Sequence, residues 1–408
     1  MKGKIIQINE CLSGSTGKIA RQIGNLAVEA GFESWIAYSA FEPEFPCKST
    51  LITIGSRADY YCHALQTRLL DNHGLASKIA TKQLICEMKR ISPDVVHLHN
   101  IHGYYLNYEI LFSYLAESGI PVIWTLHDCW PFTGHCAYFS YVNCNKWKTG
   151  CHRCPIRKDY PKSYVDRSKR NWFQKKESFN SVGNLTLVPV SNWLGNIARN
   201  SFLGEKPIRV IHNGIDLSVF RPTDMITVIK NKYGLGEKKI ILGVASVWDQ
   251  RKGVIDFYKL AKKLSREQFI IAIVGKMTEQ IPLQEDKDVQ IIHISSTDNP
   301  MELASLYSAA EVFLNTTYED NYPTVNLEAM ACGTPVITYK TGGSPEGITS
   351  NTGYVVEQGD IDSVASIIQQ LNKKDYSEQC RKQAESFFNG KVCFNPYIDL
   401  YRQLGGVK

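Results

Sequence analysis

Residues 317–346 read TYEDNYPTVNLEAMACGTPVITYKTGGSPE, and our fold prediction for the chain starts from this stretch. The apolar run 312–314 just before it predicts a buried strand, which residues 320–323 interrupt. From Thr324 onward, apolar side chains are spaced to bury one face of a helix. Gly333 and Pro335 end that helix, and the apolar run 336–338 predicts another strand. The order strand, loop, helix, strand is typical of a parallel α/β sheet, whose loops at the carboxyl ends of the strands face a ligand.

Two carboxylates bracket this loop, because Glu328 follows Asp320 by eight residues. Neither has a Lys or Arg neighbour in sequence, so the pattern does not predict an ion pair for them. A carboxylate accepts two hydrogen bonds side by side, which suits two adjacent sugar hydroxyls. The start of the helix offers unpaired backbone N–H groups to an anion. Together these features fit a sugar nucleotide, and the alternative is a plain helix start with an acidic first turn.

The stretch resembles the signature of the retaining glycosyltransferases of family 4, in which an acidic residue and a Glu lie eight apart. The resemblance extends to a Gly-x-Pro-Val turn at 333–336 and a Gly-Gly pair at 342–343. It implies an α/β protein with two Rossmann-like domains that face each other across a cleft, the GT-B fold. It also implies that Glu328 holds the nucleotide ribose and that Asp320 lies by the hydroxyls of the donor sugar. The same pocket would be lined by Asn321, Tyr322, Pro323 and Thr324.

In one respect the stretch departs from the family, since Asp320 stands where Glu is usual. The shorter side chain leaves the identity of the donor sugar open, whereas the reaction class is unaffected.

Length and composition predict a globular chain with two domains. The chain has 408 residues, of which 43% are hydrophobic and 21% charged. No stretch approaches the ~18 apolar residues that a membrane-spanning helix needs. Residues 1–5 lead directly into a strand and lack the features of a signal peptide. We therefore expect a cytoplasmic protein, peripheral on the inner membrane face, whose cysteines are reduced or bind metal.

Near the amino terminus, residues 4–8 predict a strand, residues 13–18 a Gly-rich turn and residues 19–30 a helix. This is the opening unit of a doubly wound sheet. It is not a P-loop, because the Gly-Lys-Ser/Thr order and spacing are absent. A tight turn alone explains the glycines, but the resemblance implies that Gly14 and Gly17 lie over the donor phosphates.

Two successive strands, at 95–98 and 121–126, end in residues rich in histidine. A metal site built from these histidines is disfavoured, because their spacing is irregular and no carboxylate motif accompanies them. The resemblance implies that His127 lies by the donor sugar and the acceptor, and Asp128 would orient its imidazole or the acceptor. A His-Asp pair that caps a strand end is the alternative. His99 and Asn100 are weaker candidates for lining the acceptor pocket.

Residues 129–155 form a Cys-rich insertion with little apolar core of its own. The spacing Cys151-x-x-Cys154 is that of a zinc knuckle, and two further thiols would complete a tetrahedron. The predicted structural zinc ligands are Cys136, Cys144, Cys151 and Cys154. Free buried thiols, or a disulfide, are the alternatives. The insertion is similar to one in family members that build bacterial surface polysaccharides such as colanic acid, O-antigen and capsule, and its position predicts that it shapes the acceptor site.

The net charge of +6 is concentrated in residues 157–176, which contain eight Lys or Arg and two Asp. Aromatic residues are interleaved with these charges. Such a stretch could meet an anionic membrane or a lipid-linked phosphate, or it could be an ordinary solvated helix face. A nucleic-acid partner is disfavoured because no binding motif accompanies the charge.

In the second half of the chain, Arg251 and Lys252 follow a predicted strand and precede a helix, a position that suits a diphosphate. The family usually places its Arg five residues before the Lys, where this chain has Val247. The predicted diphosphate-binding role of Lys252 therefore rests on the resemblance, and that of Arg251 rests on its charge alone. Polar or glycine residues at four other strand ends complete the predicted donor-binding set: Ser191, Asn213, Gly275 and His293.

From these patterns we predict a first domain of residues 1–186 plus a terminal helix at about 390–408, and a second domain of residues 187–389. The resemblance implies a retaining hexosyltransferase that uses a UDP- or GDP-linked donor without a catalytic metal. The acceptor would be a saccharide, such as a lipid-linked oligosaccharide of bacterial surface polysaccharide synthesis. A sugar-nucleotide epimerase of the same fold, or a catalytically silent scaffold, are the rival interpretations.

Overall fold

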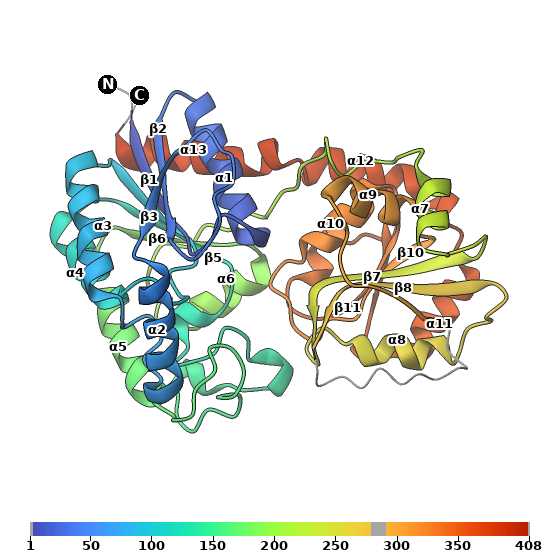
Figure 1. The fold of residues 1–408 in the computed structure, drawn as a ribbon, viewed down its shortest axis with the longest axis horizontal. Coiled ribbons are helices and arrows are strands. Elements are labelled where there is room, and N and C mark those ends of the chain that lie inside the picture. The colour runs from blue at the N-terminus through green and yellow to red at the C-terminus, as the bar shows by residue number, and fades with distance from the viewer. Residues whose placement is uncertain (1–2, 279–290, 407–408) are drawn as a thin grey trace. The chain divides into compact units, whose positions relative to one another are not determined.

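The computed structural model describes residues 3–278 and 291–406. The chain divides into two compact units (Figure 1). Unit 1 comprises Met1–His212 and Phe394–Lys408, and unit 2 comprises Asn213–Cys393.

Unit 1 contains a six-stranded parallel sheet with the strand order β3-β2-β1-β4-β5-β6. Its central strands are buried and rich in Val and Ile, as expected for a parallel sheet covered on both faces. The chain reverses its direction of winding between β1 and β4, and polar residues after these two strands lie at that switch point. The strands are β1 (Lys4–Ile8), β2 (Glu33–Ser39), β3 (Thr50–Ile54), β4 (Val95–Leu98), β5 (Val122–Leu126) and β6 (Leu185–Pro189).

The helices of unit 1 begin and end at the signals that the sequence provides. The hydroxyl of Ser56 accepts the amide of Asp59 at the start of α2, and Asn107 caps α4 in the same way. Gly119 ends α4 in the left-handed conformation. The helices are α1 (Gly14–Glu29), α2 (Arg57–Leu70), α3 (Lys78–Ile91), α4 (Tyr108–Ser118), α5 (Ser168–Asn180) and α6 (Asn192–Arg199), with 3₁₀ turns at Trp130–Phe132, Ser140–Val142 and Lys146–Lys148.

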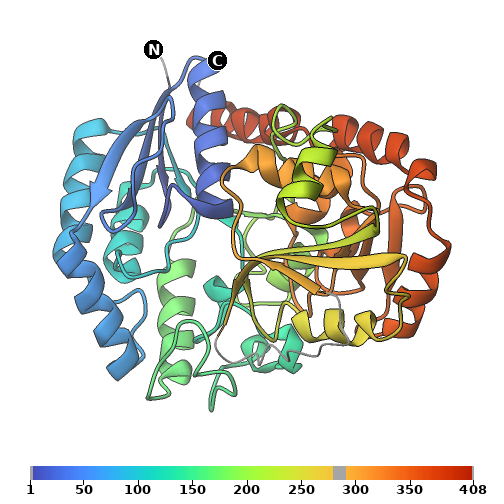
Figure 2. The same ribbon diagram turned by 45° about the vertical axis from the view of Figure 1, so that its right-hand side comes forward.

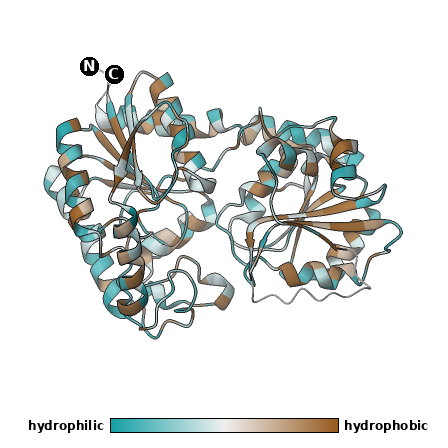
Figure 3. Ribbon diagram, viewed as in Figure 1, coloured by the Kyte–Doolittle hydropathy of each residue, from teal (hydrophilic) through white to brown (hydrophobic). Residues whose placement is uncertain are grey.

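Unit 2 repeats the architecture, with the strand order β12-β11-β10-β7-β8-β9, all parallel. Figures 1 and 2 show helices on both sides of this sheet, and Figure 3 shows that its long strands are largely hydrophobic. One face of the sheet packs its core against α8 and α11. The strands are β7 (Lys239–Trp248), β8 (Phe269–Met277), β9 (Ile291–Ile294), β10 (Val312–Asn315), β11 (Val336–Tyr339) and β12 (Gly353–Val356).

The helices of unit 2 are α7 (Ile226–Lys232), α8 (Val254–Ala261), α9 (Pro300–Ala309), α10 (Thr324–Ala331), α11 (Ile361–Gln370) and α12 (Ser377–Phe387). Two 3₁₀ turns lie at Ser344–Gly347 and Lys373–Asp375. The opening stretch therefore has the predicted order β10, loop, α10, β11. The predicted strand that contains His293 was expected to start at residue 289, and its first two residues lie outside the described part of the chain.

The boundary between the units lies at residue 212, not at the predicted residue 186. A cut at 186 would split β6, which pairs with β5 throughout its length. The last helix, α13 (Gly390–Gly405), belongs to unit 1 from Phe394 onward. The hydroxyl of Tyr401 lies 2.6 Å from Nδ1 of His97, and the hydroxyl of Tyr397 lies 2.9 Å from Oγ1 of Thr125. His97 thus anchors the terminal helix. Within the described residues, no helix has both the length and the apolar character to cross a bilayer.

Candidate functional site

The centre of the site in unit 2 is an ion pair, with Nζ of Lys252 2.6 Å from Oδ2 of Asp320. Lys252 lies between β7 and α8, and Asp320 lies between β10 and α10. Because β7 and β10 are neighbours in the sheet, the loops at their carboxyl ends meet. The sequence pattern did not predict an ion pair for Asp320, since its partner is 68 residues away. That expectation was wrong.

The electrostatics of this pair keep Asp320 ionised. Burial alone would raise the pKa of Asp320, but the charge and hydrogen bond of Lys252, followed by the charge of Arg251 and the amide of Tyr322, lower it below its ordinary value. A buried carboxylate that is held ionised is an acceptor for hydroxyl groups.

Arg251 holds the loop that carries Asp320. Its guanidinium donates to the carbonyl of Glu319 at 2.8 Å, and its own carbonyl accepts the amide of Tyr318 at 2.7 Å. The hydroxyl of Tyr318 donates to the buried carboxylate of Asp256 on α8 at 2.8 Å. Arg251 and Asp256 therefore fix the two residues just before Asp320, and Arg251 is a positioning residue as well as a cation at the site.

The Gly-Gly pair of the sequence motif also has a structural reason. A Cβ atom built on Gly342 would lie 1.8 Å from the carbonyl oxygen of Asp320, and Gly342 has a φ of +55°. The amide of Gly343 donates to that same carbonyl at 3.0 Å. The close backbone contact excludes any side chain at 342.

Glu328 lies in α10, and its Oε2 accepts the hydroxyl of Tyr307 at 3.1 Å. Tyr307 is fully buried on α9, and burial together with the neighbouring carboxylate raises its pKa, so the phenol stays protonated and donates. Sequence reasoning missed Tyr307, because a Tyr in an amphipathic helix looks like any core residue.

The other predicted donor-binding residues of unit 2 fall into two places. Asn321, Tyr322, Pro323 and Thr324 form the connection from Asp320 into α10, as predicted. Gly275 and His293 come together on β8 and β9, where the imidazole Nε2 donates to the carbonyl of Gly275 at 2.6 Å. Gly275 has a φ of +129° and packs directly against the carbonyl of Ala245, so it is inside β8 and not in a turn after it.

In unit 1, four side chains form two pairs after the ends of β4 and β5: His99 with His127, and His102 with Asp128. Nδ1 of His99 lies 3.1 Å from Nε2 of His127, and Nε2 of His99 lies 3.0 Å from Oε1 of Gln7. Because Gln7 uses its NH₂ group on the carbonyl of Ala20, its oxygen faces His99. His99 then accepts from His127, which carries its proton on Nε2. Burial lowers the pKa of His127 to about 4, so its ring is neutral at pH 7.

Asp128 has a different partner from the one expected. Its Oδ2 lies 2.7 Å from Nε2 of His102, and its Oδ1 accepts the amide of Trp130 at 2.9 Å. His127 is therefore oriented by His99, whereas the carboxylate of Asp128 pairs with His102. The pKa of Asp128 is lowered by His102 against the opposing effect of burial. The sequence does not indicate this pairing, because His102 and Asp128 are 26 residues apart and fit no motif.

The other four predicted residues lie in loops and at helix starts, apart from the site of Asp320 and from the histidines of unit 1. The hydroxyl of Ser191 accepts the amide of Leu194 and caps α6. Gly17 packs against the backbone of Leu12, where a Cβ would lie 2.3 Å from the carbonyl carbon. Gly14, with a φ of +61°, starts α1 and has open space beside it. Asn213 is buried at the start of unit 2.

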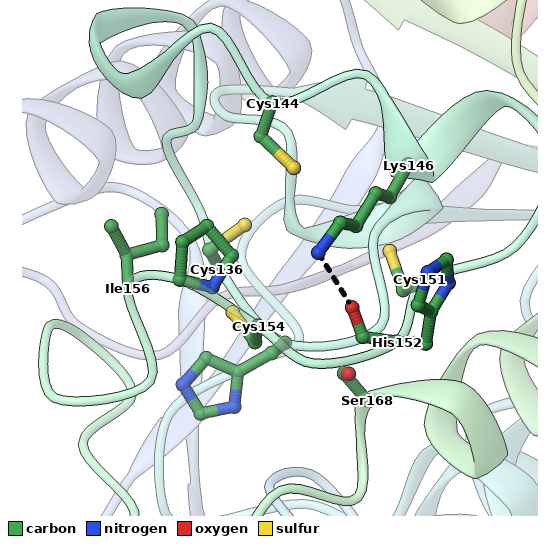
Figure 4. Close-up of a pocket in the computed structure, with 10 residues that line it drawn as sticks. Cys136, Cys144, Lys146, Cys151, His152, Cys154, Ile156 and Ser168 are labelled. Carbon is green, nitrogen blue, oxygen red and sulfur yellow. Dashed lines mark hydrogen bonds between the residues drawn. The ribbon is translucent and has the colours of Figure 1, made fainter.

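The Cys-rich insertion gathers its thiols in one pocket, lined by Cys136, Cys144, Cys151 and Cys154 (Figure 4). A hydrogen bond between Cys136 and Cys154 raises the pKa of the first thiol and lowers that of the second to about 7. Among the residues described, no group of three or more His, Cys, Asp or Glu side chains has the arrangement of a metal site. The structure therefore gives the predicted zinc no support, and zinc stays a prediction.

The basic segment at residues 157–176 is only partly exposed to solvent. Lys175 of α5 is buried, and its Nζ lies 3.3 Å from the ring centroid of Trp130 and donates to the carbonyls of Trp130 and Thr133. Burial lowers its pKa well below the ordinary value. Trp172 is also buried. Lys175 holds the turn after Asp128 in place, and the indole of Trp172 donates to the carbonyl of Trp147, so neither residue is available to a membrane.

Two family descriptions match most of the chain. Residues 17–219 match the family described as Glycosyltransferase Family 4, and residues 225–387 match Glycosyl transferases group 1. A protein named for colanic acid biosynthesis, glycosyl transferase WcaC of Escherichia coli (strain K12), is 24% identical over 76% of this chain and 77% of its own. The N-acetyl-alpha-D-glucosaminyl L-malate synthase of Bacillus anthracis is 28% identical over 53% of this chain and 58% of its own.

Solved structures show the same fold. Sucrose-phosphate synthase from Thermosynechococcus elongatus has a TM-score of 0.71 at 17% identity over the full length of both chains. Anabaena HepE, in complex with UDP-glucose, has a TM-score of 0.63 at 14% identity, over 98% of this chain and 99% of its own. The chain belongs to the group 1 glycosyltransferases of family 4, enzymes of the GT-B fold that transfer a sugar from a nucleotide-sugar donor to a sugar acceptor.

Proposed function

We propose that unit 2 binds a UDP- or GDP-linked hexose and that the hexose is transferred, with retention of its anomeric configuration, to a saccharide acceptor bound by unit 1. The observation that carries this proposal is the Asp320–Lys252 pair beside the start of α10, with Glu328 inside that helix. The UDP-glucose complex of HepE supports the nucleotide class, and the similarity to WcaC supports a role in bacterial surface polysaccharide synthesis.

In this proposal the donor is held by charge and by paired hydrogen bonds. Glu328, oriented by Tyr307, accepts the two ribose hydroxyls. Asp320, held ionised, accepts hydroxyls of the hexose. Lys252 and Arg251 lie where they offset the negative charge that develops on the leaving diphosphate, a contribution that lowers the barrier to transfer.

In unit 1, we propose that His127 contacts the acceptor hydroxyl that is glycosylated. With its proton on Nε2, the neutral ring presents Nδ1 as a hydrogen-bond acceptor. His99 and Gln7 keep the ring in this tautomer. His127 thus orients the acceptor hydroxyl without carrying a charge.

A panel of UDP- and GDP-sugars, screened by thermal unfolding, tests the donor class. At saturating concentration the preferred donor is expected to raise Tm by about 2–4 °C, because it binds only the folded protein. If no UDP- or GDP-linked sugar raises Tm, the donor class is wrong.

We further propose that the acceptor is lipid-linked and that unit 1 meets the membrane through one face of α2. Tyr61, Leu65 and Leu69 are spaced along one side of this helix and are 62%, 58% and 51% exposed. Exposed Tyr164 extends the face, because its amide donates to the carbonyl of Arg68 at 2.8 Å. Exposed basic side chains occur on α2 itself and in the segment that follows Tyr160, and they suit anionic lipid headgroups: Arg57, Arg68, Lys162, Lys169 and Arg170.

Co-sedimentation with vesicles tests this surface. We expect the protein to sediment with phosphatidylcholine vesicles that contain phosphatidylglycerol and to lose that binding at high salt. The double change Leu65→Glu and Leu69→Glu should abolish sedimentation, because it puts two charges into the apolar face. Phe387→Glu, at an equally exposed apolar residue of unit 2, is the matched control and should bind normally. Equal binding by the α2 variant would contradict the assignment.

A further inference from the structure

Glu10 is a carboxylate at the switch point of the unit 1 sheet that the mechanism above does not use. It follows β1, and its carbonyl accepts the amide of Ser39 at 3.0 Å, which fixes its backbone. Its carboxyl group lies against Gly103, where a Cβ atom would be 2.4 Å from Cδ and from Oε1. A side chain at 103 would displace this carboxylate, and the φ of +111° at Gly103 also favours glycine.

The carboxylate of Glu10 is partly buried, and no side chain or amide of residues 3–278 and 291–406 donates a hydrogen bond to it. Burial, the largest influence, raises its pKa to about 7, while the charge of His102 opposes that rise. Burying a carboxylate without a hydrogen-bond donor costs folding free energy. Carboxylates in such places are therefore candidates for ligand binding. The titratable groups that face it are His102, Glu42, Asp128, Cys11, Tyr60, Tyr104, Tyr105 and Tyr160.

His102 adds a polar group of fixed orientation next to Glu10. Its Nε2 is paired with Asp128 at 2.7 Å, and its Nδ1 lies 3.0 Å from the hydroxyl of Tyr160. Burial lowers the pKa of His102, but the charge and hydrogen bond of Asp128, together with the charge of Glu10, raise it above the ordinary value. The ring and Tyr160 are therefore held together beside the carboxylate.

Aromatic rings line the same place. The rings of Tyr60 and Tyr104 meet edge to face at 5.2 Å, and His73 lies 5.2 Å from Tyr104 and 5.5 Å from Tyr160. Tyr60 and Tyr104 are partly exposed, and Tyr160 is 42% exposed. Burial and, after it, the charge of Glu10 raise the pKa of all three tyrosines.

We infer that Glu10, His102 and the rings of Tyr60, Tyr104 and Tyr160 form a subsite for a neutral sugar residue of the acceptor. Glu10 accepts two adjacent hydroxyls, and the tyrosine rings pack against the C–H face of the sugar. The carboxylates of Glu10, Glu42 and Asp128 would repel a phosphate, so the subsite takes an uncharged sugar of the acceptor and not its lipid-phosphate end. The inference rests on the proposed function, since it names the ligand of the acceptor-binding unit.

Saturation-transfer NMR with neutral octyl glycosides (glucoside, galactoside, mannoside and N-acetylglucosaminide) tests the subsite on the full chain. At pH 8, at least one glycoside is expected to bind the wild type, and Glu10→Gln should weaken it by about tenfold or more. The affinity of the wild type should rise as the pH rises through about 7, because Glu10 then loses its proton. In Glu10→Gln this pH dependence should be absent, which a purely structural role would not produce.

Two variants of Tyr104 distinguish the contribution of its aromatic ring from that of its hydroxyl group. Tyr104→Phe should keep glycoside binding, whereas Tyr104→Ala should lose most of it. Glu87→Gln, on the surface of α3, is the matched control and should bind as the wild type does. The inference is overturned if no glycoside binds the wild type, or if Glu10→Gln binds equally well, while the nucleotide-sugar thermal shift is intact. A missing thermal shift in the wild type would instead count against the proposed function.

Discussion

Replacing Lys252 by Met is expected to lower kcat by about 100- to 1000-fold, the effect of removing one preorganised charge from a developing oxyanion. Lys252 is the cation that contacts Asp320 directly, and its position after β7 places it beside the start of α10. Steady-state kinetics with the preferred donor measure the change. Donor affinity should fall much less than kcat, because the charge matters most in the transition state.

The same change has a pH-dependent effect on stability. In the wild type Lys252 lowers the pKa of Asp320, so the pair contributes stability that is present above the unfolded pKa and lost as the pH falls. Without Lys252, burial dominates and raises the pKa of Asp320. The variant should therefore have a lower Tm than the wild type at pH 7, and the difference should shrink in acid.

The matched control is Lys263→Met, which removes an exposed lysine of the same unit that pairs with Asp362. Its kcat and Tm should stay close to those of the wild type, since exposed ion pairs contribute little. A Lys252→Met enzyme with wild-type kcat would contradict the catalytic role of Lys252.

Replacing Glu328 by Ala is expected to weaken binding of the nucleotide sugar by about 100-fold, because two charge-assisted hydrogen bonds to the ribose are lost together. The fold should be intact, since Glu328 is only partly buried. Isothermal titration calorimetry measures the affinity. Tyr307→Phe removes the hydroxyl that orients the carboxylate, so it should weaken the donor by a smaller factor.

Glu357→Ala, at an exposed glutamate that pairs with Lys340, is the control for charge removal in unit 2. It should bind the donor as the wild type does. Unchanged donor affinity in Glu328→Ala would show that this carboxylate does not hold the ribose.

Much of the fold was predictable because its strands are buried and its helices carry clear end signals. The strand predicted at residues 4–8 is β1, with the same bounds. In contrast, β3 (Thr50–Ile54) was missed, because this edge strand has only one well-buried residue and follows an irregular segment. The domain boundary was misplaced because sequence pattern alone does not show that β6 pairs with β5.

The sequence pointed to individual residues of the candidate site, but not to the contacts between them. Asp320, Glu328 and Lys252 stood out by motif, yet the ion pair between Asp320 and Lys252 depends on the order of strands in the sheet. The same limit hid the pairing of Asp128 with His102, which no spacing rule connects. Glu10 gave no signal, since a single Glu after a strand is common and only its unmatched burial sets it apart.

The most direct test of the account is a crystal structure of the enzyme with the nucleotide sugar that raises its Tm most. The account predicts diphosphate oxygens within hydrogen-bond distance of Nζ of Lys252, ribose hydroxyls on the carboxylate of Glu328, and a hexose hydroxyl on Asp320. A nucleotide bound elsewhere, or a Glu328 carboxylate that does not contact the ribose, would contradict it.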